Sequence, residues 1–315
     1  MTGAWHSNAL KSAGCRLHTL VGRRPEATAE FAARYGYQKW TTDLEEALND
    51  DAVDAVILAN PSELHASTAL ASLERGKPTL VEIPLAMSLS DAERVVDAAR
   101  ERNLPLGVVH PSRMEPEFAA LRERVSEGLE HVRQICGRFY IYRLENVGAS
   151  GYQRSWTDNL LWHHINHLVD FGLWMLDEPV RAIDSFMPPP DPTTGVPMEV
   201  VFSAQTERDQ MLVCTGSYYG RERVFEKFVV TDRESYRLDS FGDLLTLGSG
   251  ARRPAPWEEN NRRVTLDFVN AVRDGRQPAI TGESLLPTMR ALQTAQNQWD
   301  AIHGAQSLPG RPIGV

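Results

Sequence analysis

The 315-residue sequence has few cysteines and no long apolar run. Cys15, Cys136 and Cys214 lie far apart, in no spacing typical of a disulfide framework, a zinc site or a redox pair. No apolar run approaches the roughly 20 residues that a membrane-spanning helix requires. The first six residues contain neither the basic stretch nor the apolar segment of a secretory signal. We therefore expect a reduced, cytoplasmic protein with no membrane partner.

The sequence also has fewer basic than acidic residues. The sequence has 33 lysines and arginines against 42 aspartates and glutamates, which gives a net charge of −9. Non-specific nucleic-acid binding needs a positive surface, so we expect no nucleic-acid partner. The length is enough for two domains, each with its own core.

Over the first hundred or so residues, short apolar runs alternate with helical patterns. Residues 52–59 (AVDAVILA) form a near-continuous apolar run, typical of a parallel strand buried on both faces. The expected strands are 17–21, 52–59, 78–81 and 106–109, and the expected helices are 25–35, 63–75 and 90–102. This order predicts a parallel sheet with helices on both faces.

The second half has strand candidates that follow one another without intervening helices. They are residues 132–143, 181–186, 198–205, 212–219, 226–230 and 235–238. Helical patterns cover 157–176, 258–273 and 284–302. We predict an α/β fold: a Rossmann-type parallel sheet domain over residues 1–114, then an α+β domain over 115–315. The second domain is expected to have a largely antiparallel open sheet, with its C-terminal helices packing back.

Gly3 lies just before the first helical pattern. In a Rossmann domain, glycines at the first strand-to-helix turn let backbone N–H groups approach the pyrophosphate of a dinucleotide. One glycine is also compatible with a simple helix start. The strand and the two further glycines of that pattern do not precede Gly3 in this sequence. We therefore expect two unpaired strand edges where a first strand would lie.

Four spaced segments resemble those of the glucose–fructose oxidoreductase/inositol dehydrogenase (Gfo/Idh/MocA) family. They are Gly3-x-x-His6, residues 54–65, residues 76–86 and residues 109–116. The third segment has Ile83 in place of the lysine of the family's Glu-Lys-Pro motif. The resemblance implies a nucleotide-binding oxidoreductase that acts on CH–OH groups. It also implies cofactor contacts from Gly3, Ala4, Trp5, Gly22, Arg23, Arg24, Asn60, Pro61, His65, Glu82 and Ile83.

One segment resembles a narrower branch of the family. Residues 154–170 (RSWTDNLLWHHINHLVD) are similar to the corresponding stretch of 4-carboxy-2-hydroxymuconate-6-semialdehyde dehydrogenases. Those enzymes also carry Glu-Ile-Pro, and they oxidise an aromatic ring-cleavage semialdehyde as its hemiacetal. The branch implies a role in aromatic compound catabolism. A sugar or cyclitol dehydrogenase, or a non-catalytic regulatory member, remains an alternative because this family keeps its fold while its chemistry changes.

The cofactor preference is indicated by the end of the second expected Rossmann strand. NAD-specific enzymes place a carboxylate there, against the ribose 2′-hydroxyl. Here the stretch reads Val21-Gly22-Arg23-Arg24, which has no acidic residue. Two guanidinium groups can bind a 2′-phosphate through charge-assisted hydrogen bonds. The sequence therefore predicts NADP in preference to NAD.

Histidines recur on one face of the helix expected over residues 157–176. His163, His167 and Asp170 are three or four residues apart and share that face. They are compatible with hydrogen-bonded core histidines, with a zinc pair that lacks a third ligand, or with acid–base catalysis. The family resemblance favours the last, with no metal, His167 as general base, His163 assisting and Asp170 orienting His167.

A carboxylated substrate needs cations near these histidines. Arg113, Arg143 and Arg154 are the candidates, and each can hold a carboxylate bidentately. Trp162 is expected to line the same pocket. Because family members commonly pair through the open sheet of the second domain, the resemblance also implies a homo-oligomer, a dimer or a tetramer.

Overall fold

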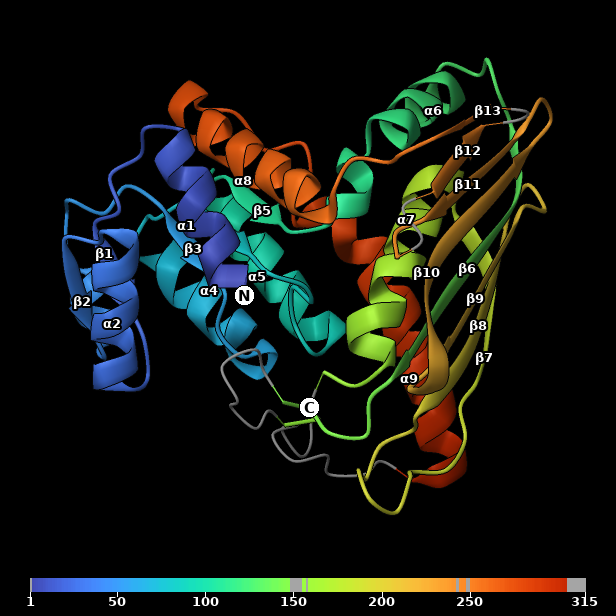
Figure 1. The fold of residues 1–315 in the computed structure, drawn as a ribbon, viewed down its shortest axis with the longest axis horizontal. Helices are drawn as coiled ribbons and strands as arrows, with labels where there is room; N and C mark the ends of the chain where they lie inside the picture. Colours follow the sequence, from blue (N-terminus) through green and yellow to red (C-terminus); the bar gives the residue numbers. More distant parts are fainter. Residues whose placement is uncertain (1, 148–154, 157, 242–243, 248–249, 305–315) are drawn as a thin grey trace. The chain divides into compact units, whose positions relative to one another are not determined.

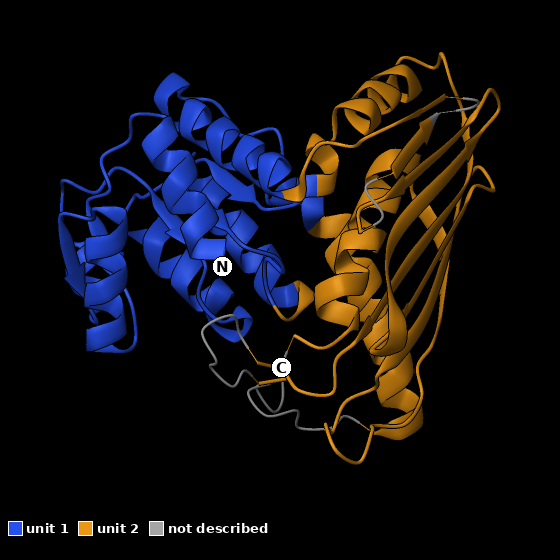
Figure 2. Ribbon diagram, viewed as in Figure 1, with its two compact units in different colours: residues 1–86, 90–111, 258–285 blue, residues 87–89, 112–257, 286–315 orange. Residues whose placement is uncertain are grey.

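The computed structural model describes residues 2–147, 155–156, 158–241, 244–247 and 250–304. The chain is divided into two compact units (Figure 2). The first unit contains residues 1–86, 90–111 and 258–285, and the second contains residues 87–89, 112–257 and 286–315. One crossing from the first unit to the second lies after residue 111, and the expected domain bounds of 1–114 and 115–315 stay a prediction. Residues 258–273, an expected C-terminal helix, contribute to the first unit.

Among the described residues, the first unit contains five short parallel strands in two separate sheets. One sheet pairs β1 (Thr19–Val21) with β2 (Lys39–Thr41). The other has the order β3 (Val56–Leu58), β4 (Thr79–Val81), β5 (Leu106–Val108). Among the described residues no strand pairing joins β1 to β3, as expected for two unpaired edges. Every residue of β4 and β5 is buried, whereas β1 has none that is fully buried.

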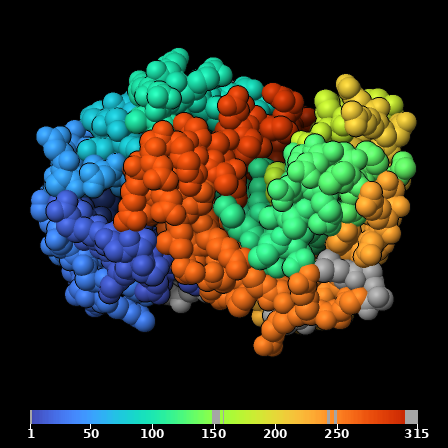
Figure 3. All heavy atoms as spheres, turned by 90° about the horizontal axis from the view of Figure 1, so that it is seen from above, coloured from blue at the N-terminus to red at the C-terminus, as the bar shows by residue number. Residues whose placement is uncertain are grey.

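Helices pack against these strands (Figure 1). They are α1 (Thr2–Ser12), α2 (Pro25–Tyr35), α3 (Leu44–Leu48), α4 (His65–Glu74), α5 (Leu89–Glu101) and α8 (Trp257–Asp274). α2 begins with Pro25 and ends at Gly36, whose φ of 79° suits glycine. Arg273 of α8 donates a hydrogen bond of 2.9 Å to the carbonyl oxygen of Ala13, just after α1. Figure 3 shows these two segments in contact, dark blue against orange.

The second unit is built on an eight-stranded sheet in the order β13-β12-β11-β10-β6-β9-β8-β7. Its strands are β6 (Val132–Tyr142), β7 (Val180–Phe186), β8 (Glu199–Thr206), β9 (Met211–Ser217), β10 (Tyr219–Thr231), β11 (Ser235–Asp239), β12 (Leu244–Leu247) and β13 (Gly250–Arg252). β6 and β9 are parallel, and every other neighbouring pair is antiparallel. This largely antiparallel sheet, with the parallel strands of the first unit, confirms the predicted fold class.

Helices α6 (Pro116–Ser126), α7 (Asn166–Leu176) and α9 (Leu286–His303) belong to the same unit. The described residues also include short 3-10 turns at Ser62–Leu64, Pro111–Met114 and Glu283–Leu285. α7 lies directly on one face of the sheet. Gly137 of β6 makes this approach possible, because a Cβ there would lie 3.0 Å from the Leu168 side chain. The buried residues of α7 therefore face the sheet at close range.

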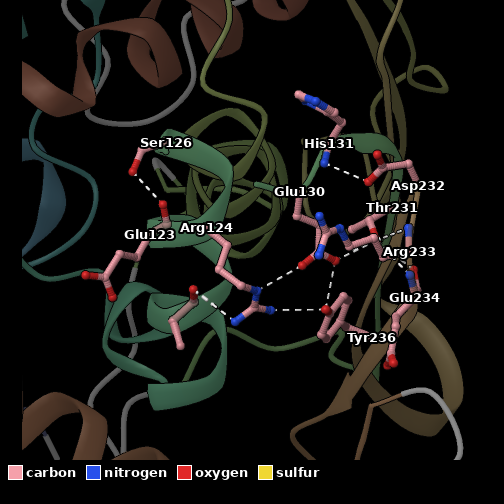
Figure 4. Close-up of polar contacts among 11 residues, drawn as sticks. Glu123, Arg124, Ser126, Glu130, His131, Thr231, Asp232, Arg233, Glu234 and Tyr236 are labelled. Carbon is pink, nitrogen blue, oxygen red and sulfur yellow. Dashed lines mark hydrogen bonds and ion pairs between the residues drawn. The ribbon is translucent and has the colours of Figure 1, made fainter. Parts of the chain in front are cut away.

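A buried carboxylate joins the end of α6 to the sheet (Figure 4). Glu130 accepts hydrogen bonds from Arg124 Nε at 2.9 Å, Thr231 Oγ1 at 2.6 Å and Tyr236 Oη at 2.8 Å. Burial alone would raise the pKa of Glu130, but these hydrogen bonds outweigh it and the pKa is lowered. The charged carboxylate therefore stabilises the junction between α6, β10 and β11.

Candidate functional site

The helix that carries the histidines begins with an irregular turn. Residues Leu161–Ile165 form a π-helical turn, and α7 follows from Asn166. Asn159 Oδ1 accepts hydrogen bonds from the N–H groups of Leu161 at 3.0 Å and Trp162 at 3.4 Å. The sequence predicted one regular helix over 157–176, and that prediction is wrong in its first part. Residue 157 lies outside the described residues. π turns are frequent at functional sites because they redirect side chains.

This turn brings three histidines together. The ring of His163 lies 4.2 Å from that of His164 and 6.4 Å from that of His167, centre to centre. His163 Nδ1 is 2.9 Å from Asp158 Oδ2, and this carboxylate is largely buried. A hydrogen bond from one ring nitrogen to a carboxylate favours one tautomer of the imidazole. The sequence reasoning gave no role to Asp158, although it precedes His163 by only five residues.

Aromatic rings surround the histidines. His164 stacks on Phe139 at 3.9 Å, and its Nδ1 lies 2.7 Å from the hydroxyl of Tyr218. His167, 9% exposed, lies 5.5 Å from the ring of Trp257 and 6.1 Å from that of Phe225. His164, Tyr218 and Trp257 were not predicted as site residues. They come from three separate elements, so no local pattern joins them.

Asp170 is held by an ion pair. Arg113 donates to its carboxylate from Nε at 2.9 Å and from Nη2 at 2.5 Å, and Thr288 donates at 3.2 Å. Arg113 is 7% exposed and Asp170 is fully buried. Arg113 was expected to bind a substrate carboxylate, but its guanidinium is engaged by Asp170. The orientation of His167 by Asp170 stays a prediction.

The remaining expected substrate residues have different surroundings. The guanidinium carbon of Arg143 lies 5.7 Å from the ring of Trp156 and 5.5 Å from that of Tyr218. Trp162 is only 2% exposed, and its Nε1 donates to Gln296 at 3.0 Å, which indicates packing rather than pocket lining. Arg154 lies outside the described residues.

In the first unit, His65 fixes the loops that follow β3 and β4. Its Nδ1 is 2.6 Å from the carbonyl oxygen of Pro84, and its Nε2 is 3.0 Å from that of Asn60. The Ile83–Pro84 peptide bond is cis. Expected cofactor residues Asn60, Pro61, His65, Glu82 and Ile83 therefore meet at the carboxyl ends of parallel strands. That edge is where open α/β sheets bind nucleotides.

His6 connects the same edge to α1 and α8. Its Nε2 lies 2.9 Å from Glu82 Oε1, and its Nδ1 lies 2.8 Å from Thr265 Oγ1. Both His6 and Glu82 are buried. Gly3, Ala4 and Trp5 lie in the first turn of α1, on the same helix. The buried contacts therefore hold the first turn of α1 to the loop after β4.

Arg23 and Arg24 follow β1 and are exposed. The Gly22 N–H donates to Thr41 of β2 at 3.1 Å. A Cβ on Gly22 would overlap the Thr28 side chain, so this turn requires glycine. The Arg24 carbonyl accepts the first hydrogen bond of α2, from the Thr28 N–H at 2.9 Å. The contact of this strand-to-helix turn with the adenosine ribose of a dinucleotide stays a prediction.

The described part of the chain contains no group of three or more histidine, cysteine, aspartate or glutamate side chains that could hold a metal ion. None of the described helices is both long and apolar enough to span a membrane. A hollow of about 530 Å³ lies between α9 and the strand ends of the second unit. Its lining includes Tyr140, Phe186, Val201, Thr215 and Trp299, and none of the three histidines contributes to it.

Comparison with known proteins gives matches over most of the chain. Residues 2–110 match an oxidoreductase family with an NAD-binding Rossmann fold, and residues 116–248 match the C-terminal region of bacterial oxidoreductases. The 4-carboxy-2-hydroxymuconate-6-semialdehyde dehydrogenase of Sphingobium sp. is 33% identical over 301 residues, which cover 92% of this chain and 93% of the relative. The NAD-dependent scyllo-inositol 2-dehydrogenase of Bacillus subtilis is 31% identical over 40% of this chain and 37% of its own.

Solved structures share the fold. Levoglucosan dehydrogenase in complex with NADH superposes with a TM-score of 0.82 at 19% identity, over 95% of both chains. An oxidoreductase domain protein from Kribbella flavida gives a TM-score of 0.82 at 22% identity, over 96% of this chain and 95% of its own. Together with the sequence matches, these similarities show that the chain belongs to the Gfo/Idh/MocA family of oxidoreductases.

Proposed function

We propose that the protein is an NADP-dependent dehydrogenase that oxidises a hydroxyl or hemiacetal carbon of a carboxylated substrate. An aromatic ring-cleavage semialdehyde such as 4-carboxy-2-hydroxymuconate-6-semialdehyde is the favoured substrate, because the relative that bears that name matches over 92% of this chain. The observation that carries the proposal is the histidine cluster, with Asp158 hydrogen-bonded to His163. A protein that only binds ligands has no need of such proton acceptors.

A bound nicotinamide cofactor would supply the hydride acceptor for the substrate carbon, so residues of this chain must take up the proton of the substrate O–H group. Imidazole suits this task because its ordinary pKa of about 6.5 lies near working pH. His167 accepts the proton, while His163, oriented by Asp158, hydrogen-bonds the substrate oxygen. Ile83 cannot take a proton where the family has lysine, so these histidines carry the acid–base chemistry.

Replacing His167 by asparagine is expected to lower kcat by about a hundredfold, because general base catalysis contributes at least that factor. Turnover is followed as NADPH absorbance with NADP⁺ and the ring-cleavage semialdehyde. NADPH affinity serves as the control and should not change. The parallel variant His303→Asn, in the last turn of α9, should retain full activity. Near-normal turnover by His167→Asn would exclude His167 as the base.

Replacing Arg23 and Arg24 together by alanine is expected to weaken NADPH binding about tenfold or more and to leave NADH binding unchanged. The reason is the loss of charge-assisted hydrogen bonds to the 2′-phosphate. Both dissociation constants are measured from nicotinamide fluorescence. Arg16→Ala, a nearby exposed arginine, is the matched control. An unchanged NADPH/NADH ratio in the double variant would contradict the assignment of NADP.

A second candidate is a sugar or cyclitol dehydrogenase. The scyllo-inositol dehydrogenase similarity and the levoglucosan dehydrogenase fold favour it. The same assay with inositols and anhydrosugars distinguishes the two candidates.

We further propose a homo-oligomer, a dimer or a tetramer. Exposed apolar side chains at the hollow of the second unit support it, among them Phe186 at 74% and Ile302 at 75% exposure.

A further inference from the structure

Arg223 and Arg143 of the second unit rest on aromatic rings without a carboxylate. The guanidinium carbon of Arg223, an exposed residue of β10, lies 4.3 Å from the ring centre of Phe241. Arg143, at the end of β6, lies over Trp156 and Tyr218 and donates to Asn146. Among the described residues neither guanidinium forms an ion pair.

Their situation differs from that of other arginines on the same sheet. Arg138 and Arg237 both bind Glu226, at 2.7 and 2.6 Å. Those two guanidinium groups therefore share one carboxylate within the protein. Arg223 and Arg143 are held in place by rings instead, and among the described residues no carboxylate occupies their N–H groups, while one nitrogen of Arg143 donates to Asn146.

Continuous ring contacts connect Arg223 to the histidines. Phe241 lies 6.2 Å from Phe139 and 6.0 Å from Phe225. Phe139 stacks on His164, and Phe225 contacts His167. Phe241 is 38% exposed, so a ligand can reach the outer side of this cluster.

The same contacts lead on to Arg143. His164 is hydrogen-bonded to Tyr218, whose ring lies 5.5 Å from the Arg143 guanidinium carbon. The cluster of Phe139, Phe225, Phe241, His164 and Tyr218 thus has an arginine at each end. These ring faces, with a guanidinium group at each end, are better suited to a flat, unsaturated ligand with two acidic groups than to a neutral polyol.

We propose that Arg223 is a specificity-determining residue that binds one acidic group of the substrate, while Arg143 binds another. This assignment rests on the proposed dehydrogenase function, and it deepens that function by naming the residue that selects a dianionic substrate. A planar guanidinium on a ring loses little freedom when it binds a carboxylate bidentately. Arg223 then supplies the cation that the ion pair of Arg113 with Asp170 does not.

The test is isothermal titration calorimetry of the full chain with isophthalate, benzoate and myo-inositol. The dissociation constant of each ligand is measured with and without NADPH. The wild-type protein is expected to bind isophthalate about tenfold more tightly than benzoate, and myo-inositol more weakly still. Arg223→Met is expected to weaken isophthalate binding about tenfold and benzoate binding less, because a charge-assisted contact is lost. Arg223→Lys should lie between the wild type and Arg223→Met.

Arg221→Met is the matched control, because Arg221 lies on the same strand and also rests on a ring. Its guanidinium carbon is 3.7 Å from the ring centre of Tyr142. This variant should leave all three dissociation constants unchanged. The proposal is overturned if Arg223→Met binds isophthalate like the wild type, if both methionine variants weaken it equally, or if the wild type does not bind it. NADPH affinity and the His167 assay do not depend on Arg223, so failure here is distinguishable from failure of the proposed function.

Discussion

Arg113→Met is expected to destabilise the protein by about 3–5 kcal/mol, the usual cost of removing one partner from a buried ion pair. The Asp170 carboxylate is fully buried, and Arg113 provides two of its hydrogen bonds. The variant would leave that charge in the interior without its guanidinium partner, while Thr288 still donates to it. Urea unfolding followed by tryptophan fluorescence measures the loss of free energy.

The double variant Arg113→Met/Asp170→Leu provides the control for this prediction. Replacing both charged partners by apolar side chains removes the uncompensated charge, and such replacements are often nearly neutral. The double variant should therefore be more stable than Arg113→Met alone. Arg122→Met, which removes an ion pair with the more exposed Asp177, should cost at most about 1 kcal/mol. A similar small loss for Arg113→Met would contradict its structural role.

Lys227→Met is expected to stabilise the protein by roughly 3–4 kcal/mol at pH 7. Lys227 is fully buried on β10, and its Nζ has no hydrogen-bond partner among the described residues. The nearest ring centre, that of Phe225, is 3.8 Å from Nζ. Burial lowers the pKa of Lys227 from 10.5 to about 7, against a smaller opposing effect of Glu115. Each pKa unit corresponds to about 1.4 kcal/mol, and methionine fills a similar volume without charge.

The pH dependence of the free energy of unfolding shows whether burial of the Lys227 charge causes the stability difference. Because the folded-state pKa of Lys227 is depressed, its ionisation has no effect on stability above pH 10.5. The destabilisation grows as pH falls from 10.5 towards 7. The stability gained by Lys227→Met should therefore be about 2–3 kcal/mol larger at pH 7 than at pH 9. Lys11→Met, at an exposed position in the last turn of α1, should show no such difference. An equal gain at both pH values would indicate packing rather than charge burial.

The sequence predicted the elements with a strong hydrophobic or capping signal. α2 has the predicted bounds, because Pro25 and Gly36 mark its ends. β2, α3, β12 and β13 were missed, since each has five residues or fewer and no clear periodicity. α6 was also missed, although Pro116 at its first position is a recognisable start signal. The strand expected over 52–59 is only Val56–Leu58.

For the site, the sequence indicated the histidines but not what surrounds them. His163 and His167 do lie together. The pairing of Arg113 with Asp170 joins residues 57 positions apart, which no local spacing reveals. The ring cluster around Phe139 depends on strand register in the same way. Asp158 is the exception, because a carboxylate five residues before a histidine can be recognised in the sequence.

The separation of β1 and β2 from the other parallel strands bears on the energetics of nucleotide recognition. Three residue pairs form that sheet, and Trp40 within it is 45% exposed. So small a sheet contributes little cooperative stability of its own. Arg23 and Arg24 stand at its end, so the side chains that we propose to select the cofactor belong to a part of the unit that is expected to open readily. Nucleotide binding there would raise the free energy of local opening of residues 19–41. The rate of amide hydrogen exchange in this segment would therefore report cofactor occupancy.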